Sequence, residues 1–535
     1  MSEVIKQSAI PANVTAERVP ESSWRSYLLA IFPIAGAILV ALARLELGKA
    51  HFPTDGALIL LALACYVTAA AFLLTDIYAP SRFLQRAGLW IASLGAFFNL
   101  SSWGVRWIAA REREMEIILR NGGEMPWVWR YIPFANLYDL SIAFAFGAAL
   151  TALLLAHRSS GRIIAALSLP LTSLILTLAI FIGNDFINLP PVLDSYWRPI
   201  HVGFASLSYG VALVCFAIAV LYLLKDGVKT EAMAIWTSIF ALAVFGSISR
   251  FGVFFTGKYT ASTIFTTAEG THISLPLRAD IAYVGPLLIV SALLLLGVIA
   301  TFGKYLASDD ARARLWGHRL LKLSFVTQAV AVVALMAQLK TTGDVLARID
   351  ASQYAQFGEW VLKQSGATVE QTAAMSQAQL QQVAAQWIAM NGQALQLNLK
   401  SNPVELAALI TALAGTFFVI LFSFRTERLR AALPSLERLD SLMYKTAGMT
   451  FALLAVLLVT GAIWANESWG RYWGWDPKET GAFVAWLTYA AYLHSRIARG
   501  WTGRRSAYFA IIGFLLIVFT YLGVSYLLPG LHSYA

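Results

Sequence analysis

The chain alternates long apolar segments with short polar ones. Thirteen apolar runs of about 17 to 23 residues are each long enough to cross the roughly 30 Å hydrocarbon layer of a bilayer as a helix. The runs are residues 27–43, 56–74, 87–107, 139–156, 163–182, 202–224, 232–249, 281–302, 323–339, 404–422, 446–464, 480–497 and 507–528. This pattern predicts an all-α fold, a polytopic transmembrane helical bundle with about thirteen spans.

Composition agrees with a membrane protein. Hydrophobic residues make up 58% of the chain and charged residues 13%, and the mean hydropathy is +0.64. The net charge of +10 would suggest nucleic acid binding in a soluble domain, but in a membrane protein such an excess belongs to basic cytoplasmic loops. We therefore expect contact with membrane lipid and no nucleic acid. Residues 1–26 are polar and lack the pattern of a cleaved signal peptide, so we expect the first apolar run to be retained as a helix.

Basic residues predict the orientation in the membrane. With a cytoplasmic N-terminus, the segments that face the cytoplasm hold more than half of the 40 Lys and Arg residues. The positive-inside rule then favours a cytoplasmic N-terminus and an external C-terminus. Runs 232–249 and 323–339 are the weakest predictions, and the loss of either one alone would invert the orientation of everything upstream. Basic stretches that flank the last three spans fix the C-terminal third independently.

Residues 341–402 form the only sizeable polar segment between spans. Apolar side chains recur there at intervals of three and four residues, which is typical of amphipathic helices. Ser376 and Gln379 have the spacing of a helix cap. We expect a small external helical hairpin that serves packing or docking. The apolar positions are Val345, Leu346, Ile349, Phe357, Trp360 and Val361, then Leu380, Val383, Trp387 and Ile388.

An aromatic stretch at 464–480 stands out from the membrane helices and is expected to form a loop on the external side. Its rings are Trp464, Trp469, Tyr472, Trp473 and Trp475, with glycines at 470 and 474. Tryptophan offers a flat rigid surface, and glycine allows a planar ligand to approach the backbone closely. The stretch therefore predicts a platform for a large flat ligand. An interfacial aromatic belt is the alternative, although a belt does not require interleaved glycines.

Polar residues in the same stretch suit other roles. Asp476 precedes Pro477 and is expected to cap the following helix. Arg471 and Lys478 are candidates to pair with carboxylates of the ligand, and lipid phosphate is an equal alternative. Three carboxylates, Glu467, Asp476 and Glu479, define a rival interpretation in which an external acidic site serves a transporter or a glycosyltransferase.

Three of the seven histidines are candidates for function. His201 begins the sixth span and His532 follows the thirteenth, so both lie on the external side with the aromatic stretch. Two neutral imidazoles that flank such a platform are suited to ligate a haem iron from its two faces. His494 lies within the twelfth span, where an ionisable residue is a functional candidate. The other four are given no special role: His51, His157, His272 and His318.

The two cysteines offer no redox pair. Cys65 and Cys215 lie in separate apolar runs, so neither a disulfide framework nor a Cys-x-x-Cys motif is present. Any thiol chemistry must come from a partner. No span carries paired histidines, which argues against an electron-transfer membrane cytochrome.

The aromatic stretch resembles a known signature. Residues 464–480 are similar to the tryptophan-rich, WWD-type haem-handling motif of the CcsA (ResC) family, a component of the cytochrome c synthase of system II. Shorter matches occur in family order along the chain. They are Pro133-Phe-Ala-Asn-Leu-Tyr-Asp139, Trp197-Arg-Pro-Ile-His-Val202, Leu436-Glu-Arg-Leu-Asp-Ser441, Tyr492-Leu-His494 and Gly530-Leu-His-Ser-Tyr534. The clear matches cover roughly 75–224 and 425–535.

The resemblance implies both a function and a set of ligands. By it, His201 and His532 correspond to external axial ligands of haem iron, and His494 to a membrane-embedded site of haem entry. The implied ligand and substrate is haem b, presented on the periplasmic side of a bacterial inner membrane for thioether attachment. The implied partners are a CcsB/ResB-like membrane protein and an apocytochrome c with a Cys-x-x-Cys-His motif. We expect a subunit of a holocytochrome c synthase, with a haem exporter that lacks lyase activity as the alternative.

The same comparison divides the chain into four parts. Residues 1–26 are a cytoplasmic tail and 27–224 an N-terminal membrane region. Residues 225–424 are expected to be an insertion with about four spans, and 425–535 a C-terminal haem-handling region. The resemblance gives no role to the insertion.

Overall fold

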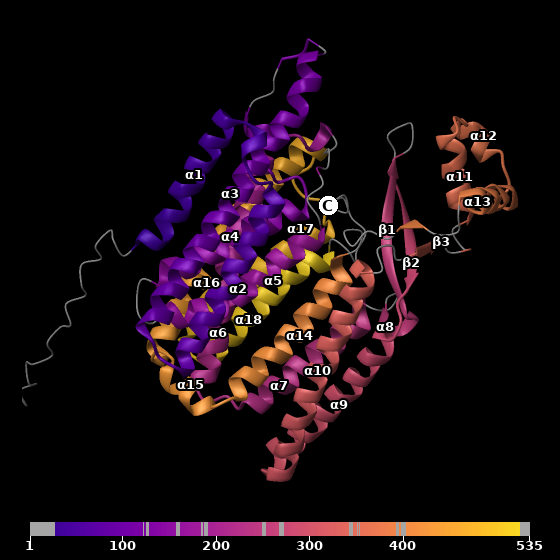
Figure 1. Ribbon diagram of the computed structural model, residues 1–535. Coiled ribbons are helices and arrows are strands. Elements are labelled where there is room, and N and C mark those ends of the chain that lie inside the picture. The colour runs from indigo at the N-terminus through magenta and orange to yellow at the C-terminus, as the bar shows by residue number, and fades with distance from the viewer. Residues whose placement is uncertain are drawn as a thin grey trace, which may run out of the picture.

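A computed structural model describes the chain over residues 27–120, 122–124, 128–156, 161–182, 186, 191–248, 253–266, 272–341, 346–349, 351, 354–391, 395–396 and 403–524. Helices dominate these residues (Figure 1). All thirteen predicted spans coincide with helices. In chain order they are α1 (Leu28–Leu47), α2 (Asp55–Tyr78), α3 (Arg82–Arg120), α4 (Leu137–Ala156), α5 (Gly161–Ile182), α6 (Trp197–Lys225), α7 (Thr230–Ile248), α9 (Val284–Ser308), α10 (Ala311–Thr341), α14 (Pro403–Ser423), α16 (Leu436–Trp469), α17 (Pro477–Arg499) and α18 (Arg504–Val518).

Ten helices among the described residues are long and apolar enough to cross a membrane, so the protein is a multi-pass membrane protein. The three predicted spans outside that set are α7, a shorter apolar helix, and α3 and α17, which have 39 and 23 residues. A π-helix, Phe519–Gly523, continues α18. The remaining helices are short: the 3-10 turns Lys49–His51, Val128–Tyr131 and Pro191–Leu193, and α8 (Val253–Thr256), α11 (Tyr354–Gln364), α12 (Val369–Ala373), α13 (Gln377–Asn391) and α15 (Thr426–Ala432).

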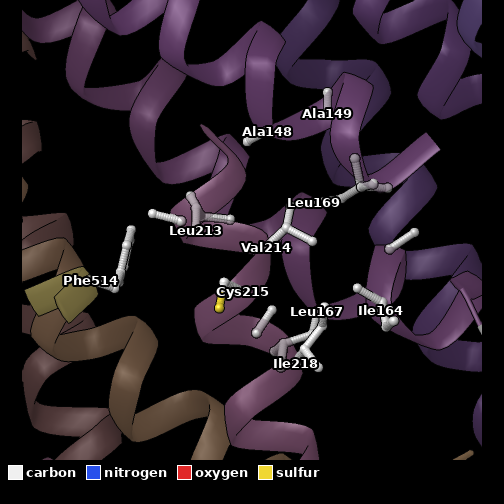
Figure 2. Packing of buried hydrophobic residues seen from close by; sticks show 14 of the residues in the cluster. Ala148, Ala149, Ile164, Leu167, Leu169, Leu213, Val214, Cys215, Ile218 and Phe514 are labelled. Atoms are coloured by element: carbon white, nitrogen blue, oxygen red, sulfur yellow. The ribbon is translucent and has the colours of Figure 1, made fainter. Parts of the chain in front are cut away.

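The main bundle combines both ends of the chain. Helices α1 to α6 pack with α16, α17 and α18 around one apolar core. Small residues let the helices approach closely: a Cβ added at Gly210 of α6 would lie 2.5 Å from the Ala148 nitrogen of α4. Figure 2 shows Cys215 of α6 inside this core, as expected for a cysteine in an apolar run.

The predicted insertion forms a second group of helices beside the first. Helices α7, α9, α10 and α14 pack together around a separate apolar core and contact the main bundle where α14 meets α5 (Figure 1). The insertion begins and ends at neighbouring points. Lys225 Nζ donates to the Arg430 carbonyl at 2.8 Å, and Arg430 Nε donates to the Leu224 carbonyl at 2.9 Å.

The part of the predicted insertion that lies outside its membrane helices is only partly helical. The predicted hairpin is present as α11 and α13, which cross where Phe357 meets Trp387 with ring centroids 5.1 Å apart. Ser376 caps α13 as predicted, since its Oγ accepts from the Gln379 nitrogen at 3.3 Å. The prediction of a helix was wrong for Leu346 and Ile349, which lie in a strand. Their backbones pair with neighbouring strands and do not form hydrogen bonds along a helix.

An antiparallel sheet of four strands lies between these helices and the membrane helices, and the sequence did not suggest it. Its order is β1 (Lys258–Thr266), β2 (His272–Asp280), β3 (Leu346–Ile349) and β4 (Leu395–Gln396). The long β1–β2 hairpin projects from the α8 and α9 end of the insertion (Figure 1). The all-α prediction therefore holds for the membrane bundle, while the segment beyond the membrane helices adds a small sheet.

Candidate functional site

A cavity opens at one end of the main bundle, where the aromatic stretch meets α6. It encloses about 1190 Å³ of free space, part of which is open to solvent. Its walls come from the segment that leads into α4, from α6, from the end of α16, and from the start of α17. His201, Trp464, Trp469 and Trp473 all line it, together with Lys478. Four of the predicted ligand-binding residues and the predicted iron ligand of α6 are therefore brought together.

The imidazole of His201 is held in a defined orientation. Its Nδ1 lies 2.9 Å from the Leu457 carbonyl oxygen on α16, and its ring centroid lies 5.7 Å from that of Trp464. A carbonyl only accepts hydrogen bonds, so Nδ1 is the donor. In the neutral ring this leaves the lone pair on Nε2, which is the tautomer that binds a metal through Nε2.

One face of α16 forms the wall beside His201. Leu457, Gly461, Trp464 and Ser468 follow one another at intervals of four, three and four residues, and all line the cavity. The prediction that 464–480 is a loop was wrong for its first six residues. They continue α16 because the helix ends only at Gly470, which adopts φ +68° and donates to the Asn466 carbonyl.

Three buried donors around the cavity have no hydrogen-bond partner within the described part of the chain. They are Trp464 Nε1, Ser468 Oγ and Trp473 Nε1. Trp464 and Ser468 are 8% and 9% exposed. Buried polar groups normally find partners, so donors left open around a cavity indicate a polar ligand or water there. The space, the flat apolar walls and the His201 nitrogen fit a metalloporphyrin.

The loop after α16 is short and locked by its own carboxylates. Asp476 caps α17, as predicted, by accepting from the Lys478 nitrogen at 2.9 Å. Glu479 accepts from the Gly474 and Asp476 nitrogens at 2.8 and 3.2 Å. Trp475 has φ +57° and is 69% exposed, so the loop turns this ring outward. Trp475 does not line the cavity but packs edge-on against Trp473.

The two basic candidates of this stretch occupy different places. Arg471 is exposed, packs over Gly474 and lies outside the cavity lining. Lys478 lines the cavity at the start of α17, before the predicted span 480–497. Burial lowers the pKa of Lys478 to about 8, and the neighbouring Asp476 opposes this change. Lys478 is therefore the better placed of the two to meet an anionic group of a ligand.

The other predicted iron-binding histidines lie elsewhere. His494 is exposed on α17, on the side opposite the buried Tyr492 and Ser495, and does not line the cavity. Its neighbour Arg496 donates to Asp440 of α16 at 2.9 Å. His532 lies outside the described residues.

The carboxylates of the rival acidic site are engaged in local bonds. Glu467 accepts from Ser195 Oγ at 2.6 Å, while Asp476 and Glu479 serve the cap of α17. No group of three or more metal-binding side chains occurs in the part of the chain that the structure describes. The geometry therefore offers this rival no assembled site.

Sequence reasoning did not find several residues of the cavity. Gly461 and Ser468 share the helical face of Trp464, so extending that helix through Trp469 would have revealed them. Phe134 and Arg198 also line the cavity. They lie in segments matched by the resemblance, but no local pattern gives them a role.

Together these features define a class: a multi-pass membrane protein with a histidine-bearing, tryptophan-walled cavity at the ends of its helices. The family model described as "Cytochrome C assembly protein" matches residues 134–532, which is most of the chain. The chain belongs to this family.

Individual relatives match a smaller part. The chain is 57% identical over 99 residues to "Cytochrome c biogenesis protein CcsA" of Guillardia theta and 60% identical over 98 residues to that of Prochlorococcus marinus (strain MIT 9515). Each match covers 18% of this chain, and 33% and 31% of those relatives. The protein of the same description from Pyropia yezoensis is 54% identical over 99 residues, again 18% of this chain and 31% of the relative. The chain thus spans about a third of the length of the curated relatives it matches.

Proposed function

We propose that this chain is the integral membrane haem-binding component of a system II cytochrome c synthase, of the WWD type. In this role it carries haem b to the external face of the membrane and positions it for covalent attachment to apocytochrome c. Family membership supports a role in cytochrome c biogenesis. The observation that carries the haem proposal is the cavity that His201 lines together with Trp464, Trp469 and Trp473.

The reaction determines what this chain must supply. Attachment adds each of two cysteine S–H bonds across a haem vinyl C=C bond, so that a C–S and a C–H bond form with no net oxidation. Cys215 is buried and Cys65 lies in a membrane helix, so the thiols come from the Cys-x-x-Cys-His motif of the apocytochrome. The chain contributes position: it holds the ring so that the vinyl carbons meet the thiols.

His201 provides one axial nitrogen in this proposal, and His532 provides the other. Trp464, Trp469 and Trp473 contact the ring, with Trp475, Arg471 and Asp476 completing the loop around its edge. His494 serves haem entry from within the membrane. Its exposure on α17 suits a site completed by a CcsB/ResB-like partner, because ionisable side chains in membrane helices normally face protein or water.

The proposal includes a location in the cell. We propose that the chain lies in a bacterial inner membrane, with the N-terminus in the cytoplasm and the C-terminus in the periplasm. The excess of basic residues in the predicted cytoplasmic segments supports this orientation.

The decisive experiment is the absorption spectrum of the purified protein reduced with dithionite. The wild type is expected to show a low-spin haem spectrum that His201→Ala and His532→Ala each weaken and that added imidazole restores. His51→Ala is a matched control, because His51 Nδ1 also lies 2.9 Å from a backbone carbonyl, that of Leu47, but far from the cavity lining. Absence of haem from the wild type, even after copurification with a CcsB/ResB-like partner, would refute the proposal.

A further inference from the structure

Three buried hydrogen-bond donors remain open around the cavity that His201 and Trp464 line, which we call the aromatic cavity. They are Trp464 Nε1, Ser468 Oγ and Trp473 Nε1, and none has a partner among the residues that the structure describes. Trp464 and Ser468 are 8% and 9% exposed. Buried donors that stay unpaired destabilise a fold, so three of them at one cavity indicate an acceptor that binds there.

The three donors come from one stretch of the chain. Trp464 and Ser468 lie four residues apart on α16, which places them on the same face of the helix. Trp473 belongs to the loop that follows the helix end at Gly470. An indole N–H can only donate a hydrogen bond, so the group that satisfies the two tryptophans must be an acceptor. The end of α16 and its loop therefore present a site for a group rich in acceptor atoms.

One cation and two carboxylates stand beside these donors. Lys478, the second residue of α17, lines the aromatic cavity. Asp476 accepts from the Lys478 backbone nitrogen at 2.9 Å. Glu479 also lines the cavity, and its Oε2 accepts from the Gly474 and Asp476 nitrogens at 2.8 and 3.2 Å. Both carboxylates are thus held by backbone N–H groups of the loop, while the ammonium of Lys478 adds a positive charge to the neutral donors.

A carboxylate of a ligand suits this set of donors. Its two oxygens offer about four lone-pair sites, and hydrogen bonds to an ionised acceptor are stronger than bonds to a neutral one. Haem b, the ligand of the proposed function, carries two propionate carboxylates on one edge and its two vinyl groups away from them. Water is the competing acceptor, and it differs from a propionate in carrying no charge.

We propose that the haem propionates bind to Trp464 Nε1, Ser468 Oγ and Trp473 Nε1, with Lys478 adding its charge. This inference rests on the proposed function and deepens it, because it fixes the direction of the ring. The propionate edge lies at the end of α16 and the start of α17, and the vinyl groups lie away from these helix ends. The thiols of the peptide therefore approach from another side of the cavity.

The test compares two probes, iron protoporphyrin IX and its dimethyl ester, in titrations of the purified protein. The ester keeps the ring, the iron and the vinyl groups but removes both negative charges. Wild type is expected to bind the diacid at least about tenfold more tightly, because the open donors then bond to an ionised acceptor. Both probes are expected to give the low-spin spectrum that His201 supports, since esterification leaves the iron unchanged.

Variants then locate this preference at the open donors. Ser468→Ala removes one hydroxyl, and Trp464→Phe removes an N–H group but keeps a flat ring. Each is expected to lower the preference for the diacid by about threefold or more, while the affinity for the ester changes less. Trp469→Phe is the matched control, because Trp469 lines the same cavity but is 38% exposed and its N–H is not among the buried open donors. The control should keep the wild-type preference.

The outcomes separate this inference from the proposed function. Equal binding of the two probes by the wild type would assign the open donors to water and overturn the inference alone. An unchanged preference in both Ser468→Ala and Trp464→Phe, or an equal fall in Trp469→Phe, would also overturn it. Binding of neither probe would overturn the proposed function and this inference with it. If Trp464→Phe does not fold, Ser468→Ala and the wild-type comparison decide without it.

Discussion

His201 of α6 lies directly against Gly461 of α16. A Cβ placed on Gly461 would be 2.7 Å from His201 Cε1 and 2.9 Å from Nδ1, closer than real Cβ contacts. The absence of a side chain at Gly461 is therefore what allows the imidazole to reach the Leu457 carbonyl at 2.9 Å. The position of the predicted iron ligand depends on a residue 260 positions away in a different helix.

Gly461→Ala is expected to displace His201 while leaving α16 helical. Since ligand groups must be held to within about 0.5 Å, haem binding should fall by about tenfold or more. The reduced absorption spectrum and a haem titration measure this loss. Gly448→Ala is the control, because Gly448 lies on the same helix with nothing within 4 Å of the added Cβ. Equal loss in both variants would show that the contact with His201 is not the cause.

The hydrogen bond from Ser195 Oγ to Glu467 Oε2 connects the start of α6 to the end of α16. Ser195→Ala is expected to cost about 1 kcal/mol of unfolding free energy. It should also raise hydrogen exchange at residues 464–470, since the end of α16 loses this anchor. Ser468→Ala makes the same chemical change at a hydroxyl without a partner among the described residues, so it should leave the stability unchanged. Unaltered exchange in Ser195→Ala would contradict the anchoring role.

Lys478 predicts a pH dependence of ligand binding. With a pKa of about 8, its ammonium is charged at pH 7 and largely neutral at pH 9. Attraction of an anionic ligand is then lost as the pH rises through 8, which we expect to weaken haem binding by about 1 kcal/mol. Titrations at pH 7 and pH 9 measure the difference, and Lys478→Met should remove it.

Unfolding does not explain such a loss. Between the folded pKa of about 8 and the usual lysine value of 10.5, the unfolded chain binds more protons at Lys478 than the folded one. The contribution of this residue to stability therefore rises with pH in that window. A variant Lys478→Met that keeps the wild-type pH dependence would assign the effect to another group.

Asp139 of α4 belongs to a buried ion-pair cluster with Arg106 of α3. It accepts from Arg106 and from the Ala135 nitrogen at 2.9 Å, and both Asp139 and Arg106 are 1% exposed. Asp139→Ala removes one carboxylate from a buried guanidinium that also bonds to Asp55, so we expect a loss of about 3–5 kcal/mol in unfolding free energy. Thermal unfolding in detergent measures it. Asp139→Asn keeps an acceptor for Ala135 and should lose less; equal stability of Asp139→Ala and wild type would contradict this account.

The sequence predicts the membrane helices well, because their length and apolarity are local properties. The same holds for the caps of α13 and α17, where Ser376 and Asp476 bond to residues within one helical turn. The sheet was missed because the pairing of β2 with β3 joins residues about seventy positions apart. A strand outside the membrane helices need not be long and apolar, so its sequence carries no comparable signal.

The sequence predicted the residue types of the candidate site, but only part of its geometry. The rings of Trp464, Trp469 and Trp473 do converge with His201, as the flat-ligand interpretation requires. The contribution of Gly461 depends on a contact between helices that are distant in the sequence, and such a contact leaves no periodic signal. His494 and Trp475 were selected by residue type and position in the sequence, but they lie outside the cavity lining. The roles proposed for them stay predictions.

The bonds between Lys225, Leu224 and Arg430 place the two ends of the insertion next to each other. A segment of some two hundred residues therefore leaves the main bundle and returns to it at a single junction. Helices α6 and α16, which flank this segment in the sequence, pack directly against each other. Acquisition or loss of the segment in evolution would need only one join to be remade, without moving a residue of the cavity. Apart from the contact of α14 with α5, the predicted insertion can thus change in sequence without altering the helices that line the cavity.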